Sequence, residues 1–90
     1  MQITHNHQLR QFETTIDGKT AFLSYQVITP DTLNYHHTFV PSELGGRGIG
    51  SKLVQFALDY ADNSKQKIIP SCSFVAAYID KHSHYQHLMA

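Results

Sequence analysis

Four of the chain's five glycines, Gly45, Gly46, Gly48 and Gly50, lie in the segment SELGGRGIGSKL at residues 42–53. Glycine gives up more backbone freedom on folding than any other residue, so this cluster indicates a bend that other residues could not form. Apolar side chains alternate before the segment, as in strands, and follow the period of a helix after it. The bend therefore joins a strand to a helix.

The residues before the bend predict a meander of three strands. Asp17 and Gly18 tolerate positive φ and predict a tight hairpin between the first two strands, and Pro30 predicts a type I turn before the third. Residues 1–7 are expected to be a flexible tail or the lead-in to the first strand. The predicted strands span residues 9–16, 19–28 and 33–40. One face of the third strand should carry Leu33, Tyr35, His37 and Phe39.

The residues after the bend predict a helix, a short strand and a second helix. One helical stripe of apolar side chains begins at Ile49, and KIIP at residues 67–70 reads as a buried strand. The last helix, SFVAAYIDKH, should be capped by Ser71 or Ser73. The resulting order is β-β-β-α-β-α, a mixed α+β fold whose last two strands are parallel through a right-handed crossover. Ligands of such units bind beyond the carboxyl ends of the strands, where the bend lies.

The length and the charge of the chain limit its function. Its 90 residues predict one domain, and 41% apolar residues suffice for a single core. Seven basic and seven acidic residues cancel, which disfavours nucleic acid or a membrane surface as a partner. Cys72, the single cysteine, cannot form an internal disulfide, and no signal or membrane-spanning segment is evident. We therefore expect a cytoplasmic protein, and the sequence is compatible with a monomer.

The glycine bend has the features of a phosphate-binding loop. The first amides of a helix lack intrahelical acceptors, and the helix dipole adds partial positive charge beside them. Glycines let an anion approach the backbone closely, and Arg47 and Lys52 lie nearby to supply charge. The alternative is a loop that only turns the chain.

Two common phosphate-binding motifs do not fit the bend. Gly45 and Gly50 have the spacing of a P-loop, but Ser51 and Lys52 follow in the reverse of the order that a P-loop requires. The dinucleotide motif GxGxxG also fails, because no third glycine follows Gly48 and Gly50 at the required spacing.

A third motif does fit. VPSELGGRGIGSKLV resembles motif A of the GNAT acetyltransferase superfamily, in which a strand leads through [Q/R]-x-x-G-x-[G/A] into a long helix. Gly48, Ile49 and Gly50 match G-x-G, whereas Gly45 replaces the usual Gln or Arg. Together with KIIPSCSFVAAYIDKHSHYQ, the segment is similar to the small, single-domain YjdJ-like branch, over residues 36–88. The resemblance implies a truncated GNAT fold with a splayed pair of parallel strands.

The resemblance also implies a ligand, acetyl-coenzyme A, and an amine as acceptor, either a small molecule or a protein. The main-chain amides of the bend would bind the pyrophosphate, and the pantetheine arm would lie between the third strand and residues 67–70. An amide at the end of the third strand would polarise the thioester carbonyl. The implied coenzyme-binding residues are Phe39, Val40, Gly46, Arg47, Gly48, Ile49, Gly50 and Ser51.

Three residues are candidates for the transfer chemistry. Cys72 precedes a helix, where a thiol pKa can fall, and would act as an acetyl carrier or shape the pocket of the leaving thiol. Tyr78 on the last helix is a candidate general acid, and His37 a candidate general base. Each also has a purely structural interpretation, as a buried thiol, a core aromatic or a hydrogen-bonded histidine.

Three classes of function remain open from the sequence. The first is an acetyl-coenzyme A-dependent N-acetyltransferase. The second is a coenzyme A-binding or regulatory module without transfer activity, which needs a partner to complete the acceptor site. The third is a protein-interaction domain that uses the bend only structurally. Despite the seven histidines we expect no metal site, because no Cys or acidic partner stands at a typical ligand spacing.

Overall fold

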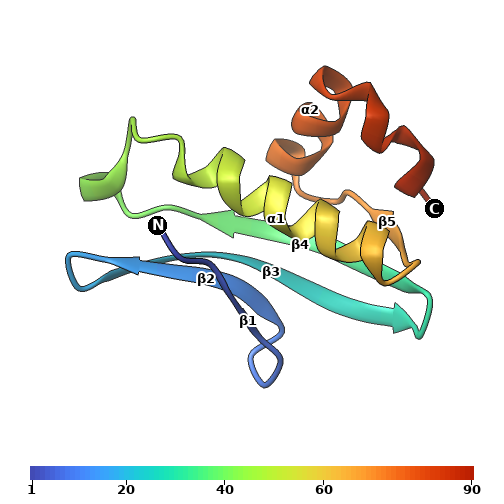
Figure 1. The fold of residues 1–90 in the computed structure, drawn as a ribbon, viewed down its shortest axis with the longest axis horizontal. Helices are drawn as coiled ribbons and strands as arrows, with labels where there is room; N and C mark the ends of the chain where they lie inside the picture. Colours follow the sequence, from blue (N-terminus) through green and yellow to red (C-terminus); the bar gives the residue numbers. More distant parts are fainter.

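The computed structural model describes residues 1–90 as one five-stranded sheet with two α-helices (Figure 1). Strands β1 to β4 are antiparallel neighbours in chain order, and β5 lies parallel to β4 after the α1 crossover. The prediction of a mixed fold with a final parallel pair is therefore confirmed. The elements are β1 Thr4–Asn6, β2 Gln11–Ile16, β3 Lys19–Thr29, β4 Thr32–Phe39, α1 Ile49–Asn63, β5 Lys67–Ile69 and α2 Ser73–Lys81, with 3₁₀ helices η1 Ser42–Leu44 and η2 Ser83–Leu88.

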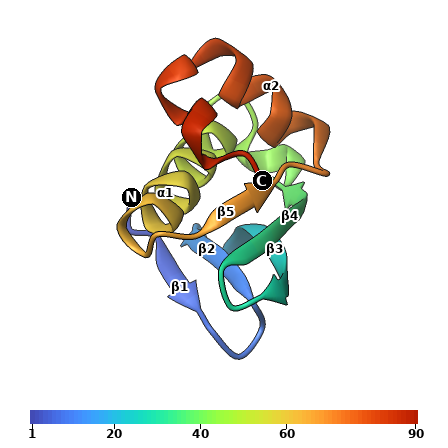
Figure 2. The same ribbon diagram turned by 90° about the vertical axis from the view of Figure 1, so that its right-hand side faces the viewer.

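The helices leave one face of the sheet uncovered. Helix α1 packs across β2, β3 and β5, while α2 and η2 pack beside α1 (Figure 2). No helix covers the opposite face of β3 and β4. No helix of the fold combines the length and the apolarity needed to cross a membrane.

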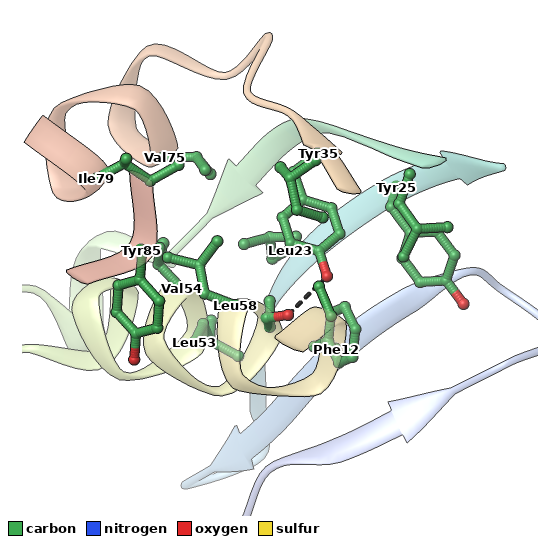
Figure 3. Packing of buried hydrophobic residues seen from close by; sticks show 14 of the residues in the cluster. Phe12, Leu23, Tyr25, Tyr35, Leu53, Val54, Leu58, Val75, Ile79 and Tyr85 are labelled. Carbon is green, nitrogen blue, oxygen red and sulfur yellow. Dashed lines mark hydrogen bonds between the residues drawn. The ribbon is translucent and has the colours of Figure 1, made fainter. Parts of the chain in front are cut away.

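The core lies between α1 and the sheet (Figure 3). Phe12, Leu23 and Tyr35 project from the sheet against Leu53 and Leu58 of α1, and all five are fully or almost fully buried. The Tyr35 hydroxyl donates a hydrogen bond of 2.6 Å to the Ala57 carbonyl oxygen. This bond satisfies the one polar group of a side chain that is otherwise packed among apolar neighbours.

The hairpin prediction is confirmed at Asp17 and Gly18. Their φ values are 53° and 74°, so both central residues of the turn are left-handed, as a type I′ turn requires. Glycine takes this conformation without strain, and aspartate is one of the few other residues that tolerate it.

The structure places an additional strand within residues 1–7, where the sequence predicted a tail or a lead-in. Residues Thr4–Asn6 pair with β2, and His5 lies inside the strand. The His5 ring packs on Phe12 and Tyr60, and its Nε2 lies 2.6 Å from the Tyr25 hydroxyl oxygen. These partners are distant in sequence, which is why the polar segment gave no strand signal of its own.

A β-bulge in β4 overturns the prediction that His37 and Phe39 share a face with Tyr35. Tyr25 pairs with Tyr35, but Ser24 pairs with His37, so the bulge leaves one β4 residue without a partner. The extra residue moves His37 and Phe39 to the uncovered face, where both are exposed. There both rings contact Phe22, with centroid distances of 5.8 Å and 5.6 Å.

We predict that His5 makes the free energy of unfolding pH-dependent. Burial, followed by the nearby His7, lowers the pKa of His5 from its ordinary 6.5. The unfolded chain then binds more protons than the folded chain, so stability should fall as the pH drops below 6.5. Urea unfolding of the wild type and of His5→Gln between pH 7 and 5 should show a shallower pH slope in the variant.

The matched control is His36→Gln, because His36 is exposed. This variant should keep the slope of the wild type. A slope that His5→Gln does not change would show that His5 is not the responsible group.

Candidate functional site

A row of unpaired backbone donors lies where the bend meets α1. The Gly45 amide donates to the Ser42 carbonyl oxygen and the Lys52 amide to that of Gly48, each over 3.1 Å. The six amides between them, at residues 46–51, donate to no backbone or side-chain acceptor. With the positive end of the α1 dipole beside them, these donors favour an anion, and most of all a phosphate.

Gly46 and Gly48 set the backbone conformation of the amide row, and Gly50 lets α2 approach it. Gly46 and Gly48 have φ values of 77° and 72°, and a Cβ at either would meet nothing within 4 Å. The space in front of them is therefore open to a ligand. A Cβ at Gly50, in contrast, would lie 3.1 Å from the Phe74 ring and 3.6 Å from Cγ2 of Val40. Gly50 thus allows the first turn of α1, the end of β4 and the start of α2 to meet.

The side chains of the bend offer fewer contacts to an anion than its backbone amides do. Arg47 turns to the β2–β3 hairpin, where its Nη1 lies 3.8 Å from Oδ2 of Asp17, and both side chains are largely exposed. Ile49 is buried in the core, which leaves only its amide to face a ligand. Ser51 is exposed at the start of α1.

Next to the bend, β4 and β5 part. Their parallel register joins Thr32, Leu33 and Asn34 of β4 to β5, and the Cys72 amide then donates to the Tyr35 carbonyl oxygen over 3.0 Å. Beyond Tyr35, no strand pairs with this edge of β4. The splayed pair that the fold prediction contained is therefore present. The unpaired edge continues through Phe39, which is 44% exposed, to Val40.

Cys72 lies at the inner end of this gap, as the N-cap residue of α2. Its Sγ is 3.6 Å from Oγ1 of Thr38. Partial burial raises the pKa of the thiol, but hydrogen bonds from the Val75 amide, the Thr38 side chain and the Phe74 amide outweigh it, so the pKa lies below its ordinary value. The thiol is thus predisposed to ionise. The prediction that Ser71 or Ser73 caps this helix is wrong, because Cys72 holds that position.

A hollow of about 130 Å³ lies between the start of α1 and one face of α2. Within it the Tyr78 and His82 rings stack at 3.9 Å, and His82 Nδ1 lies 2.8 Å from the Tyr78 carbonyl oxygen. The hollow is lined by Ser51, Phe74, Ala77, Tyr78, Lys81 and His82. Sequence reasoning missed Phe74, Lys81 and His82, although with Tyr78 they recur at the spacing of one helical face. Sequence reasoning also missed Thr38, because the β-bulge in β4 decides on which face of the sheet the Thr38 side chain lies.

The structure does not bring the three predicted catalytic residues together. Tyr78 belongs to the hollow, where burial and the charge of Asp59 raise its pKa, and its ring contacts are with His82 and Tyr85. His37 lies on the uncovered face of the sheet. Only Cys72 lies at the parting of β4 and β5, and the acid and base roles of the other two stay predictions.

We predict that the Thr38 hydroxyl helps to keep the Cys72 pKa low. Replacing Thr38 by valine preserves the shape of the side chain but removes the hydrogen bond to the sulfur, so the thiol pKa should rise. The rate of alkylation by iodoacetamide, measured against pH, should reach its midpoint at a higher pH in Thr38→Val. Ser71→Ala, which changes an exposed neighbour of Cys72, is the control and should leave the midpoint unchanged.

The sequence matches the GCN5-related N-acetyl-transferase family over residues 11–88. It is 28% identical to Protein NATD1 of Xenopus tropicalis and 29% identical to that of Mus musculus, over 98% of this chain and 83% and 82% of those proteins. The solution NMR structure of a GCN5-like protein from Staphylococcus aureus is similar with a TM-score of 0.77 and 31% identity, over 99% of this chain and 87% of that one. The narrower YjdJ-like branch stays a prediction. Because the match spans most of its length, the chain belongs to the GCN5-related N-acetyltransferase family.

Proposed function

We propose that this protein binds acetyl-coenzyme A and transfers the acetyl group to an amine. The observation that carries the proposal is the juxtaposition of six unpaired amides, at residues 46–51, with the unpaired edge of β4. The amides suit a diphosphate, and a strand edge suits an extended arm that contains amide groups. Coenzyme A contains both groups in series.

In this proposal the backbone supplies most of the binding. The amides of residues 46–51 hold the pyrophosphate, with Arg47 adding charge at the rim of the row. The pantetheine arm runs along the β4 edge past Phe39 and Val40. Phe39 is exposed and Val40 contacts the start of α1, so this arm would be covered by apolar side chains on its way to Cys72.

The transfer step needs an oxyanion donor, a base and an acid. A main-chain amide of the β4 edge donates to the carbonyl oxygen of the thioester and stabilises the negative charge that develops there. The neutral amine attacks the carbonyl carbon, the carbon–sulfur bond breaks, and the coenzyme leaves as a thiolate that takes up a proton. The amine loses one proton, for which His37 is the candidate base.

The acceptor reaches the thioester from the uncovered face of the sheet. The inner face of β4 is closed by α1 and the core, whereas His37 and Phe39 are exposed on the outer face. A base on that face can take the proton of an incoming amine without crossing the strand. His37 therefore stays the candidate base, although the bulge places it on the opposite face from the one predicted.

Cys72 acts at the thioester carbon in this proposal. As a carrier, its thiolate would attack the carbonyl and release the coenzyme thiolate, and the amine would then attack the acetyl-cysteine. Its lowered pKa and its position beside Thr38 suit this step. Otherwise Cys72 shapes the pocket of the leaving thiol during direct transfer.

The open face also favours a second candidate, a coenzyme A-binding module without transfer activity. No helix of this chain walls an acceptor site there, so a partner would have to supply the wall. Release of coenzyme thiol in the presence of a panel of amines separates the two functions. Saturable binding of acetyl-coenzyme A with thiol release at the buffer rate would favour the module.

We predict that Gly48→Ala weakens coenzyme binding. A Cβ at this position enters the open space in front of the amide row. The affinity for acetyl-coenzyme A, measured by calorimetry, should fall by about tenfold or more, the equivalent of about 1.4 kcal/mol.

Gly18→Ala is a matched control for this experiment. Gly18 has a φ of 74°, close to the 72° of Gly48, and its Cβ would also meet nothing within 4 Å. Both variants should lose a similar free energy of unfolding, roughly 1–2 kcal/mol for a left-handed alanine. Only Gly48→Ala should lose affinity, and equal affinities in the two variants would contradict the amide row as the binding site.

We predict that Cys72→Ala lowers the turnover rate by about tenfold or more, about 1.4 kcal/mol of transition-state stabilisation, with little change in coenzyme affinity. If Cys72 carries the acetyl group, mass spectrometry of the wild type mixed with acetyl-coenzyme A alone should detect acetylation at Cys72. Full turnover of Cys72→Ala would remove the residue from the mechanism.

A further inference from the structure

The hollow between α1 and α2 adjoins the amide row directly. Ser51 links the two, because its amide is the last of the row and its side chain lines the hollow. The Phe74 ring of α2 would lie 3.1 Å from a Cβ at Gly50, so the start of α2 adjoins the first turn of α1. A ligand with an anionic group on the row can therefore extend a neighbouring group to Lys81 and His82.

Both basic side chains of the hollow keep donors available. Lys81 has no carboxylate within 4.0 Å, whereas Lys19 and Arg47 are each paired with one. His82 uses Nδ1 for its contact with the Tyr78 carbonyl oxygen, which leaves Nε2 without a partner. Because the chain has a formal net charge of zero, an anion here is held by local groups and not by a general field.

The hollow also offers aromatic surface next to these donors. Phe74 is 43% exposed at one end, and the Tyr78 and His82 rings lie nearly parallel, with an interplanar angle of 15°. Flat rings beside a cation suit a ligand that combines a planar base with a phosphate monoester.

We propose that this hollow is a phosphate subsite in which Lys81 and His82 bind the 3′-phosphate of coenzyme A, so that the protein prefers coenzyme A to dephospho-coenzyme A. The inference rests on the proposed function, because the amide row must hold the diphosphate of the same ligand. Lys81 supplies a full positive charge and His82 an imidazole donor, and hydrogen bonds to a phosphate dianion are of the strong, charge-assisted kind.

The test compares two ligands that differ only in the 3′-phosphate. Calorimetry should show that the wild type binds coenzyme A about tenfold more tightly than dephospho-coenzyme A, as expected for one charge-assisted contact. In Lys81→Gln this preference should fall to about twofold or less, through weaker binding of coenzyme A alone. His82→Gln should reduce the same preference without changing the affinity for dephospho-coenzyme A.

Lys65→Gln is the matched control. Lys65 is exposed just beyond the carboxyl end of α1, the end opposite to the amide row, so its loss removes the same charge and should leave the preference intact.

If the wild type binds the two ligands equally, the phosphate subsite is wrong but the proposed function stands. The same conclusion follows if Lys81→Gln loses affinity for both ligands equally. If the wild type binds neither ligand, the proposed function fails and the subsite with it.

Discussion

The packing of α1 on the sheet positions every part of the candidate site. Tyr35 is fully buried beneath the helix, and its hydroxyl is hydrogen-bonded to the Ala57 carbonyl oxygen, so β4 and α1 are fixed to each other near the middle of both (Figure 3). The start of α1 then lies beside the end of β4, and the Cys72 amide, bonded to the Tyr35 carbonyl oxygen, brings α2 to the same strand. One buried tyrosine thus connects the strand edge, the amide row and Cys72.

Local signals made much of the fold predictable from the sequence. The turn at Asp17 and Gly18 and the change of period at the glycine bend depend on residues that are close in the chain, and both are observed. The strand around His5 and the bulge in β4 depend on partners in other strands, such as Tyr25 and Ser24. Alternation alone cannot register an extra residue, which is why His37 was assigned to the wrong face.

The candidate site also has a part that depends on local sequence and a part that depends on distant partners. Its backbone component was predictable, since glycines at a strand-to-helix junction leave amides unpaired whatever surrounds them. Apart from Cys72, its side chains were not predictable, because the contact of Thr38 with Cys72 and the contribution of Lys81 and Ser51 to one hollow depend on tertiary packing. Contacts of this kind arise from tertiary packing, which a linear pattern does not encode.

The short strand β5 is held on both sides. Beyond its pairing with β4, the Ala90 amide donates to the Ile68 carbonyl oxygen over 3.0 Å, and Met89 forms a bridge to Ile68. The strand that leads to the parting is therefore held by backbone contacts on both of its edges and needs no ligand to keep it in place. The parting of the strands is thus set by the protein's own hydrogen bonds, so in the proposed function a coenzyme arm laid along the β4 edge loses little of its binding energy to ordering the protein.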